Sequence, residues 1–353
     1  MAIIFAILIF SFLIFVHELG HFMAAKASGV QVNEFAMFMG PALVKWQRGE
    51  TLYSIRCIPF GGYCAMEGED ADTENPRSFQ KAAWWKRMII LIAGAAMNFI
   101  AGFLIFALVF SCKPGFSQPV IGEAEPGNTI VYEEGLHIGD RILEVDGNRV
   151  FISSDTTLLL ELYPSDTHDL VVERDGKKIH LNDFAMQLHE FPNTDGSVSM
   201  RYGIRFAAQE KTLGSLLSYT WNNCLSVIQS VKLSLQMLLT GQAGIKDVSG
   251  PAGIVDMMSQ TAQASRNIWD AIENLLYFGA FISVNLAVMN LLPIPALDGG
   301  RAVALILTVA VESVTHRKID PKYEGYIHAA GMIVLLAFMA VVTFKDIFMI
   351  FKG

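Results

Sequence analysis

The chain has 353 residues, of which 52% are hydrophobic and 17% charged, and its mean hydropathy is +0.40. This composition excludes an ordinary soluble domain and indicates a membrane protein. A formal net charge of −8, with no basic stripe in the sequence, excludes nucleic acid as a partner.

Four apolar segments are long enough to cross about 30 Å of hydrocarbon at about 1.5 Å per residue. They are Met1–Ala25, Met88–Cys112, about Leu275–Leu297, and His328–Phe351. The small residues at Ala24–Ser28 resemble the cleavage site of a signal peptide. However, no Lys or Arg precedes Lys26, so the basic start of a signal peptide is missing. We therefore expect the first segment to remain as a transmembrane helix.

Polar residues interrupt the first segment within FVHELGHF, Phe15 to Phe22. His17 and His21 are four residues apart, so both imidazoles lie on one helical face and can reach one cation. Glu18 stands next to His17 and suits a general base for metal-assisted hydrolysis. Two histidines satisfied by helix neighbours are the alternative, but an unpaired glutamate inside an apolar span is strongly unfavourable. The pattern therefore predicts a metal site.

Between the first two segments the sequence takes on extended character. The run from Leu43 to Cys64 has two strand-like stretches around a turn at Arg48-Gly49-Glu50, and Gly61-Gly62 closes it. This pattern predicts a β-hairpin beside the first helix, within about residues 29–66.

The segment Gln118–Ala208 holds the only clearly globular pattern in the chain. Two strand-turn-strand units, with turns at Asp146-Gly147 and Asp175-Gly176, predict a compact β-rich module. Apolar residues then recur at spacings of four and three, which predicts an amphipathic helix that packs on a partner or lies on the membrane. This stripe comprises Leu217, Trp221, Cys224, Ile228, Val231, Leu235 and Leu238, with Asn222, Asn223, Gln229 and Lys232 off it.

A third metal ligand is needed, because a catalytic zinc usually takes three protein ligands and keeps one open position. Asp298 is the one carboxylate in NLLPIPALDGGR, Asn290 to Arg301. Pro293 and Pro295 interrupt the backbone and Gly299-Gly300 permit a tight turn, so a broken helix around a buried site is predicted. Alone, Asp298 would read as a helix-end cap; beside two histidines that lack a third ligand, ligation is favoured.

Basic residues flank the membrane segments on two short loops. They are Lys26, Lys86 and Arg87 between the first two segments, and Arg301, Arg317, Lys318 and Lys322 between the last two. Short loops keep their bases on the cytoplasmic side. We therefore expect both loops to be cytoplasmic, with both ends of the chain and the long stretch 113–274 outside.

Taken together, these motifs resemble the bacterial site-2 proteases, a family of intramembrane zinc metalloproteases that includes the protease regulating the sigma-E envelope stress response. Besides FVHELGHF and NLLPIPALDGGR, three further stretches are similar to family motifs: TLYSIRCIPFGGYCAMEGED, AGAAMNF around Asn98, and VSGPAGI at Val248–Ile254. GLHIGDRILEVDGNRV is similar to the PDZ modules of these proteases, and a single such module fits before the amphipathic helix.

The resemblance implies a membrane α-helical bundle of four transmembrane helices, with a membrane-associated β-hairpin and an inserted β-rich PDZ-like domain. Residues 1–112 would hold the first two helices, 113–208 the PDZ-like domain, 209–270 the amphipathic helix and connector, and 271–353 the last two helices. It also implies roles for seven residues. They are the zinc ligands His17, His21 and Asp298, the general base Glu18, and the substrate-binding positions Asn290, Gly61 and Gly62.

The implied function is regulated intramembrane proteolysis in the bacterial cytoplasmic (inner) membrane, with the active site toward the cytoplasm. Substrates would be single-span membrane proteins, such as anti-sigma factors or signal-peptide remnants, already cut by an upstream site-1-type protease. The PDZ-like domain would act as a size filter or docking element. A noncatalytic membrane scaffold, presenting its PDZ module and using metal only structurally, is the alternative; the presence of Glu18 favours the enzyme.

Overall fold

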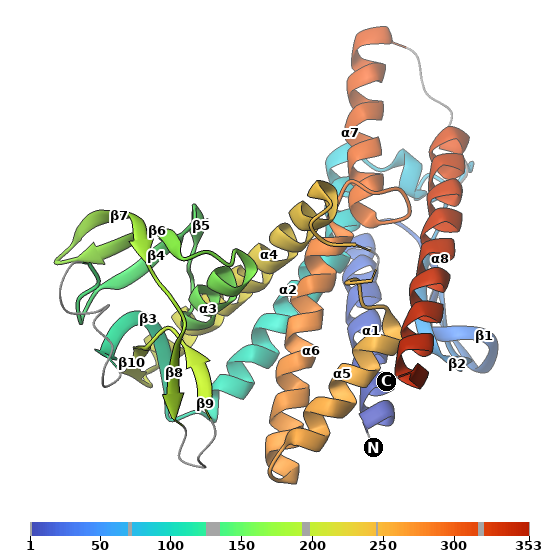
Figure 1. Cartoon of the computed structure of the whole chain (residues 1–353). Helices are drawn as coiled ribbons and strands as arrows, with labels where there is room; N and C mark the ends of the chain where they lie inside the picture. The colour runs from blue at the N-terminus through green and yellow to red at the C-terminus, as the bar shows by residue number, and fades with distance from the viewer. Residues whose placement is uncertain are drawn as a thin grey trace. The chain divides into compact units, whose positions relative to one another are not determined.

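The computed structural model describes residues 2–69, 73–124, 135–192, 198–244, 246–316 and 321–352. The chain divides into two compact units (Figure 1). We call Met1–Phe106 with Ser230–Gly353 the helical unit, and Ala107–Gln229 the β unit. The basic residues Arg317 and Lys318 of the topology prediction lie outside the described residues.

Four long apolar helices are found in the described part of the chain. They are α1 (Ala2–Ser28), α2 (Trp84–Ser111), α6 (Ile268–Asn290) and α8 (Pro321–Lys352). Each contains at least 23 residues that are apolar enough to cross a membrane, which confirms the predicted number of spans.

The third span differs from the predicted Leu275–Leu297. Helix α6 begins after Asn267, whose side chain accepts hydrogen bonds from two backbone N–H groups of the first turn, and it ends at Asn290. The apolar composition continues beyond that point, but Pro293 and Pro295 cannot continue a helix, so residues 291–297 form a loop.

Small residues let the membrane helices approach closely. A Cβ built on Gly20 of α1 would lie 2.3 Å from the carbonyl oxygen of Ala93 on α2. One built on Gly102 of α2 would lie 2.6 Å from the side chain of Val284 on α6. Close backbone contact of this kind is how helices associate where lipid offers no hydrophobic driving force.

The predicted hairpin is present as β1 (Val32–Arg48) and β2 (Thr51–Met66), joined by a turn in which Gly49 has a φ of 61°. Phe35 of β1 pairs with both Tyr53 and Cys64, so the first half of β1 lies between two segments of β2. Several large apolar side chains of the hairpin are exposed, as expected for a membrane-associated element. They are Met39, Leu43, Val44, Trp46 and Ile58.

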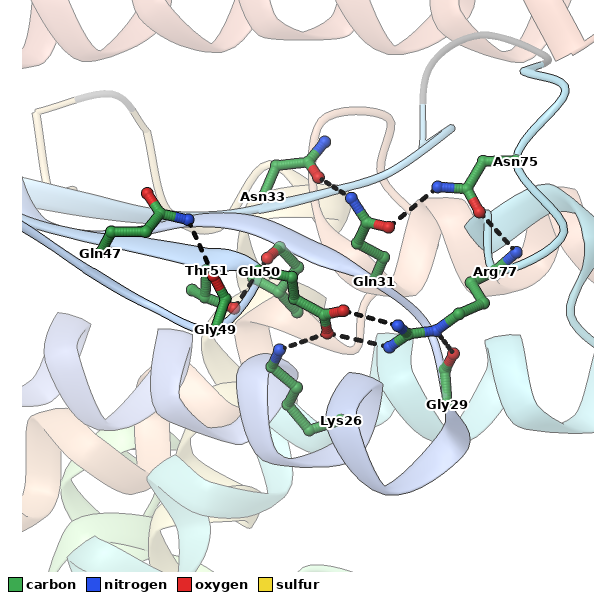
Figure 2. Close-up of polar contacts among 11 residues, drawn as sticks. Lys26, Gly29, Gln31, Asn33, Gln47, Gly49, Glu50, Thr51, Asn75 and Arg77 are labelled. Carbon is green, nitrogen blue, oxygen red and sulfur yellow. Dashed lines mark hydrogen bonds and ion pairs between the residues drawn. The ribbon is translucent and has the colours of Figure 1, made fainter.

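An ionic cluster joins the turn of the hairpin to the end of α1 (Figure 2). Lys26 donates to the Glu50 carboxylate at 2.7 Å, and Arg77 donates to both carboxylate oxygens at 2.5 and 2.9 Å. Arg77 also donates to the carbonyl oxygen of Gly29. Because Arg77 and Lys26 donate to it, the pKa of the Glu50 carboxyl is lowered from 4.5 to about 2. The hairpin is therefore tied to α1 at its polar turn.

Further elements complete the helical unit: η1 (Phe79–Lys81), α5 (Pro251–Ala264) and α7 (Asp298–Thr315). Helix α4 (Leu213–Thr240) contributes its part from Ser230 onward. The N-terminus of α5 is capped from α8, because the buried Asp346 carboxylate accepts hydrogen bonds from the backbone N–H groups of Gly250 and Gly253 at 2.7 and 2.9 Å.

The β unit contains a six-stranded sheet in the order β10-β3-β4-β6-β7, with β5 paired to β4, together with a β8–β9 pair and helix α3. The element bounds are β3 (Gly115–Ala124), β4 (Arg141–Val145), β5 (Asn148–Arg149), α3 (Ser153–Leu162), β6 (Thr167–Arg174), β7 (Lys177–Ala185), β8 (His189–Pro192), β9 (Val198–Arg201) and β10 (Ile204–Glu210). Both predicted turns are present, with positive φ at Asp146-Gly147 and at Asp175-Gly176.

Helix α4 is the predicted amphipathic helix, but its buried face differs from the predicted stripe. Leu217 and Trp221 are 46% and 49% exposed, whereas Thr220 and Asn223 are buried. These polar side chains donate to carbonyl oxygens one turn earlier in their own helix, at 2.8 Å each. Such internal bonding satisfies their polar groups and permits burial, which an apolar periodicity does not register.

Candidate metal centre

The two histidines of α1 lie on one face of the helix and converge. His21 is buried and His17 is half-buried, and their Nε2 atoms are 3.2 Å apart. This distance suits a hydrogen bond between the two rings, and it equally suits two nitrogens that bind one cation.

Asp298, the first residue of α7, completes the cluster. Its Oδ2 atom lies 3.2 Å from Nε2 of His17 and 3.3 Å from Nε2 of His21. A tetrahedral zinc with bonds of about 2.0–2.1 Å would separate its ligand atoms by about 3.3 Å. The three atoms therefore stand at the spacing of a zinc face, and among the described residues they form the one such cluster.

Two further observations fit a cation at this position. The Oδ2 atom of Asp298 is buried and accepts no hydrogen bond from the described residues, although both imidazoles face it. Gly94 of α2 faces the same atoms: a Cβ there would lie 2.3 Å from Nε2 of His21 and 2.7 Å from Cε1 of His17. The donor set of two imidazoles and one carboxylate is also one that zinc takes in catalytic sites.

Outer contacts orient the histidine rings. The Nδ1–H of His21 donates to the backbone carbonyl oxygen of Ile90 at 2.8 Å, which leaves its Nε2 lone pair toward the cluster. On His17, Nδ1 lies 3.4 Å from the amide nitrogen of Asn98 and 3.5 Å from that of Asn290. The amide oxygen of Asn98 is buried and has no hydrogen-bond partner among the described residues.

Glu18 lies beside the cluster without belonging to it. Its Cγ atom would be 3.5 Å from a Cβ at Gly62 of β2, and the backbone of Cys64 lies within hydrogen-bonding reach of its carboxylate. The second strand of the hairpin therefore passes beside the predicted base.

The predicted substrate-binding positions are not all at the centre. Asn290, at the end of α6, and Gly62 both lie beside it. Gly61, with a φ of 84°, faces Met39 of β1 instead, and a Cβ there would lie 2.9 Å from the Met39 side chain.

The loop that carries Asp298 turns differently from the prediction. Gly299 and Gly300 do not make the tight turn. They pack against the loop, because a Cβ on either would lie 2.2 to 2.3 Å from the carbonyl oxygens of Ile294 or Leu291. The left-handed turn is made by Ala296, with a φ of 83°.

Sequence reasoning missed Gly94, whose importance depends on which face of α2 meets the histidines. Asn98 was noted only as part of AGAAMNF. A polar residue in an apolar helix is a signal for function. Gly94 is four positions before Asn98, so the two residues lie on one face of α2.

The model for peptidase family M50 matches residues 5–338 of the chain. A protein of Clostridium perfringens, named as a candidate zinc metalloprotease, is 37% identical over 349 residues, with 98% of each chain covered. The zinc metalloprotease RasP of Shouchella clausii is 30% identical, with 98% of each chain covered. The regulator of sigma-W protease RasP of Bacillus subtilis is 28% identical, with 97% of each chain covered.

Proposed function

The chain belongs to peptidase family M50 and is an intramembrane zinc metalloprotease, and from that premise we propose which of its residues carry out the reaction and on what substrates. His17, His21 and Asp298 are the zinc ligands. When bound there, zinc supplies Lewis-acid polarisation of the scissile carbonyl and favours deprotonation of the attacking water. The observation that carries this assignment is the 3.2–3.3 Å convergence of their three ligand atoms.

Glu18 is the general base. It takes the proton of the attacking water and passes it to the leaving amine, so one carboxylate serves both halves of peptide hydrolysis. Its place beside the cluster, outside the ligand set, suits this role.

Asn98 fixes the tautomer of His17. For Nε2 to bind a metal, the proton must sit on Nδ1 and needs an acceptor. The oxygen and nitrogen of an amide are interchangeable by a flip, so turning Asn98 over places its otherwise unpartnered oxygen 3.4 Å from Nδ1 of His17. The amide of Asn290 is then left to bond the backbone of a substrate.

The substrate is a transmembrane segment of a single-span membrane protein. A helical segment hides its peptide groups, so it must unwind before hydrolysis, and the segment of β2 beside Glu18 offers a strand edge that can hold it extended. The name of the Bacillus subtilis relative, a regulator of a sigma factor, favours substrates of the anti-sigma-factor type. Prior cutting by a site-1-type protease would provide a substrate without its bulky outer domain.

The end of α1 and the start of α2 face the cytoplasm of a bacterial inner membrane. Lys26 lies near the end of α1, and Lys86 of α2 donates to the carbonyl oxygen of Ser28, so these bases gather on one side. The β unit then lies outside, where a PDZ-like domain would serve as a size filter or docking element.

Substitution of Glu18 by Gln separates the enzyme from a noncatalytic scaffold. The variant should fold and keep about one zinc per chain, yet lose at least about 10²-fold in cleavage of a tagged single-span substrate in detergent or liposomes. Glu161→Gln, at an exposed position of α3, is the matched control and should cleave normally. Wild-type cleavage by zinc-replete Glu18→Gln protein would remove Glu18 from the reaction.

A further inference from the structure

The loop that presents Asp298 contains a residue in a conformation it does not favour. Ala296 has a φ of 83°, in the left-handed region where residues other than Gly, Asn and Asp are uncommon. Such a backbone persists only where its surroundings determine it. Since Ala296 is two residues before the ligand, whatever holds it also sets the direction of Asp298.

Helix α8 holds the backbone of Ala296 in this conformation. The backbone N–H of Ala296 donates to Nδ1 of His328 at 3.1 Å, and His328 is only 8% exposed. Accepting this bond requires that Nδ1 carry no proton, so the ring is in its Nε2–H form. His328 is not part of the metal cluster itself.

Gly331 supports the same loop one turn along α8. A Cβ there would lie 2.4 Å from Cβ of Pro295 and 2.8 Å from its carbonyl carbon, so no side chain fits. His328 and Gly331 are three residues apart and therefore share one face of the helix. That face touches two consecutive residues of the loop.

We propose that His328 and Gly331 form a clamp that holds the Pro295–Ala296 backbone and thereby aims Asp298 at the two histidines. His328 is thus a positioning residue for a metal ligand 30 positions away in the sequence. The inference rests on the proposed role of Asp298 as a ligand, and the experiment below separates the two.

Two amide substitutions of His328 make a matched pair. Asn places its amide oxygen where Nδ1 stands and can still accept from Ala296, whereas Gln places its oxygen one bond further out. Zinc dissociation constants are measured by chelator competition on the full-length protein in detergent, alongside the unfolding temperature of the zinc-free protein. His328→Gln should weaken zinc binding by about 10- to 100-fold, the range found for groups that orient ligands. His328→Asn should stay within about threefold of wild type, and the zinc-free unfolding temperatures of the two should agree.

A background substitution tests the mechanism. Gly adopts a φ of 83° without strain, so in Ala296→Gly protein the loop depends less on the clamp, and His328→Gln should cost less zinc affinity there. The clamp is refuted if His328→Gln binds zinc like wild type, if Asn binds it as weakly as Gln, or if Ala296→Gly leaves the loss unchanged. Asp298→Asn reports on the ligand assignment alone: if it keeps wild-type zinc affinity, the proposed metal site is wrong, whatever His328 does.

Discussion

Replacing Gly94 by Ala should weaken zinc binding although no proposed ligand is replaced. The new Cβ would lie 2.3 Å from Nε2 of His21, whereas real Cβ contacts stay above 3.0 Å, so the ring or α2 must move by at least about 0.7 Å. Zinc ligands tolerate displacements of only about 0.2 Å. If the ring moves, its zinc bond is lost, and if α2 moves, the Ile90 carbonyl group that orients the ring moves with it. In either case zinc affinity should fall by about 10-fold or more, because losing an orienting group costs about 10- to 100-fold.

The assay is chelator competition for zinc, followed by cleavage of a tagged single-span substrate on the same preparation. Gly325→Ala on α8 is the control: no described atom lies within 4 Å of a Cβ there, so zinc binding and cleavage should stay at wild-type levels. Far-ultraviolet circular dichroism should show both variants folded. Wild-type zinc affinity in folded Gly94→Ala protein would refute the argument that α2 forms a wall of the metal centre.

Other consequences can be measured independently. Asn98→Leu should weaken zinc binding by about 10- to 100-fold, because Nδ1–H of His17 loses its acceptor. Asn98→Asp should retain zinc affinity, because a carboxylate can still accept that hydrogen bond. The opposite order would mean that the amide of Asn98 donates to the ring. Because the pKa of Glu50 is lowered from 4.5 to about 2, its ionised carboxylate stabilises the fold above pH 4.5, and this stabilisation is lost as the pH falls through about 2. The wild-type protein should therefore unfold at a higher temperature than Glu50→Gln protein above pH 4.5, and this difference should vanish as the pH falls to about 2. A difference that does not depend on pH would contradict the ionic cluster. An impermeant maleimide applied outside intact cells should label the exposed Cys112. It should not label Cys224, because Cys224 is buried and burial raises the pKa of its thiol to about 11. Labelling of Cys112 only after lysis would reverse the proposed topology.

Much of the fold and of the candidate site can be predicted from composition and from the local spacing of residues. The number of membrane helices follows from apolar length, and the two turns of the β unit follow from their Asp-Gly pairs. The convergence of His17 and His21 follows from a separation of four residues on a helix. In each case the deciding interaction is local, so the sequence contains it directly.

The remaining features depend on packing between distant segments. Gly94 looks like any helix glycine until α2 is placed against the histidines. A tight turn is predicted at the Gly299-Gly300 pair, but tertiary contacts place the turn at Ala296, in a left-handed conformation. The buried Thr220 and Asn223 of α4 satisfy their polar groups inside their own helix, which a hydrophobic pattern cannot report.

The separation of the ligands along the chain bears on how the enzyme is made. About 280 residues separate His21 from Asp298, and at about 5–20 residues per second their synthesis occupies roughly 14–56 s. Throughout that interval the first helix already carries two histidines and Glu18, but no carboxylate from α7 has yet been translated. On the proposed ligand set, a nascent chain that has not reached Asp298 lacks its third zinc ligand, so it should be unable to cleave neighbouring proteins that enter the membrane beside it.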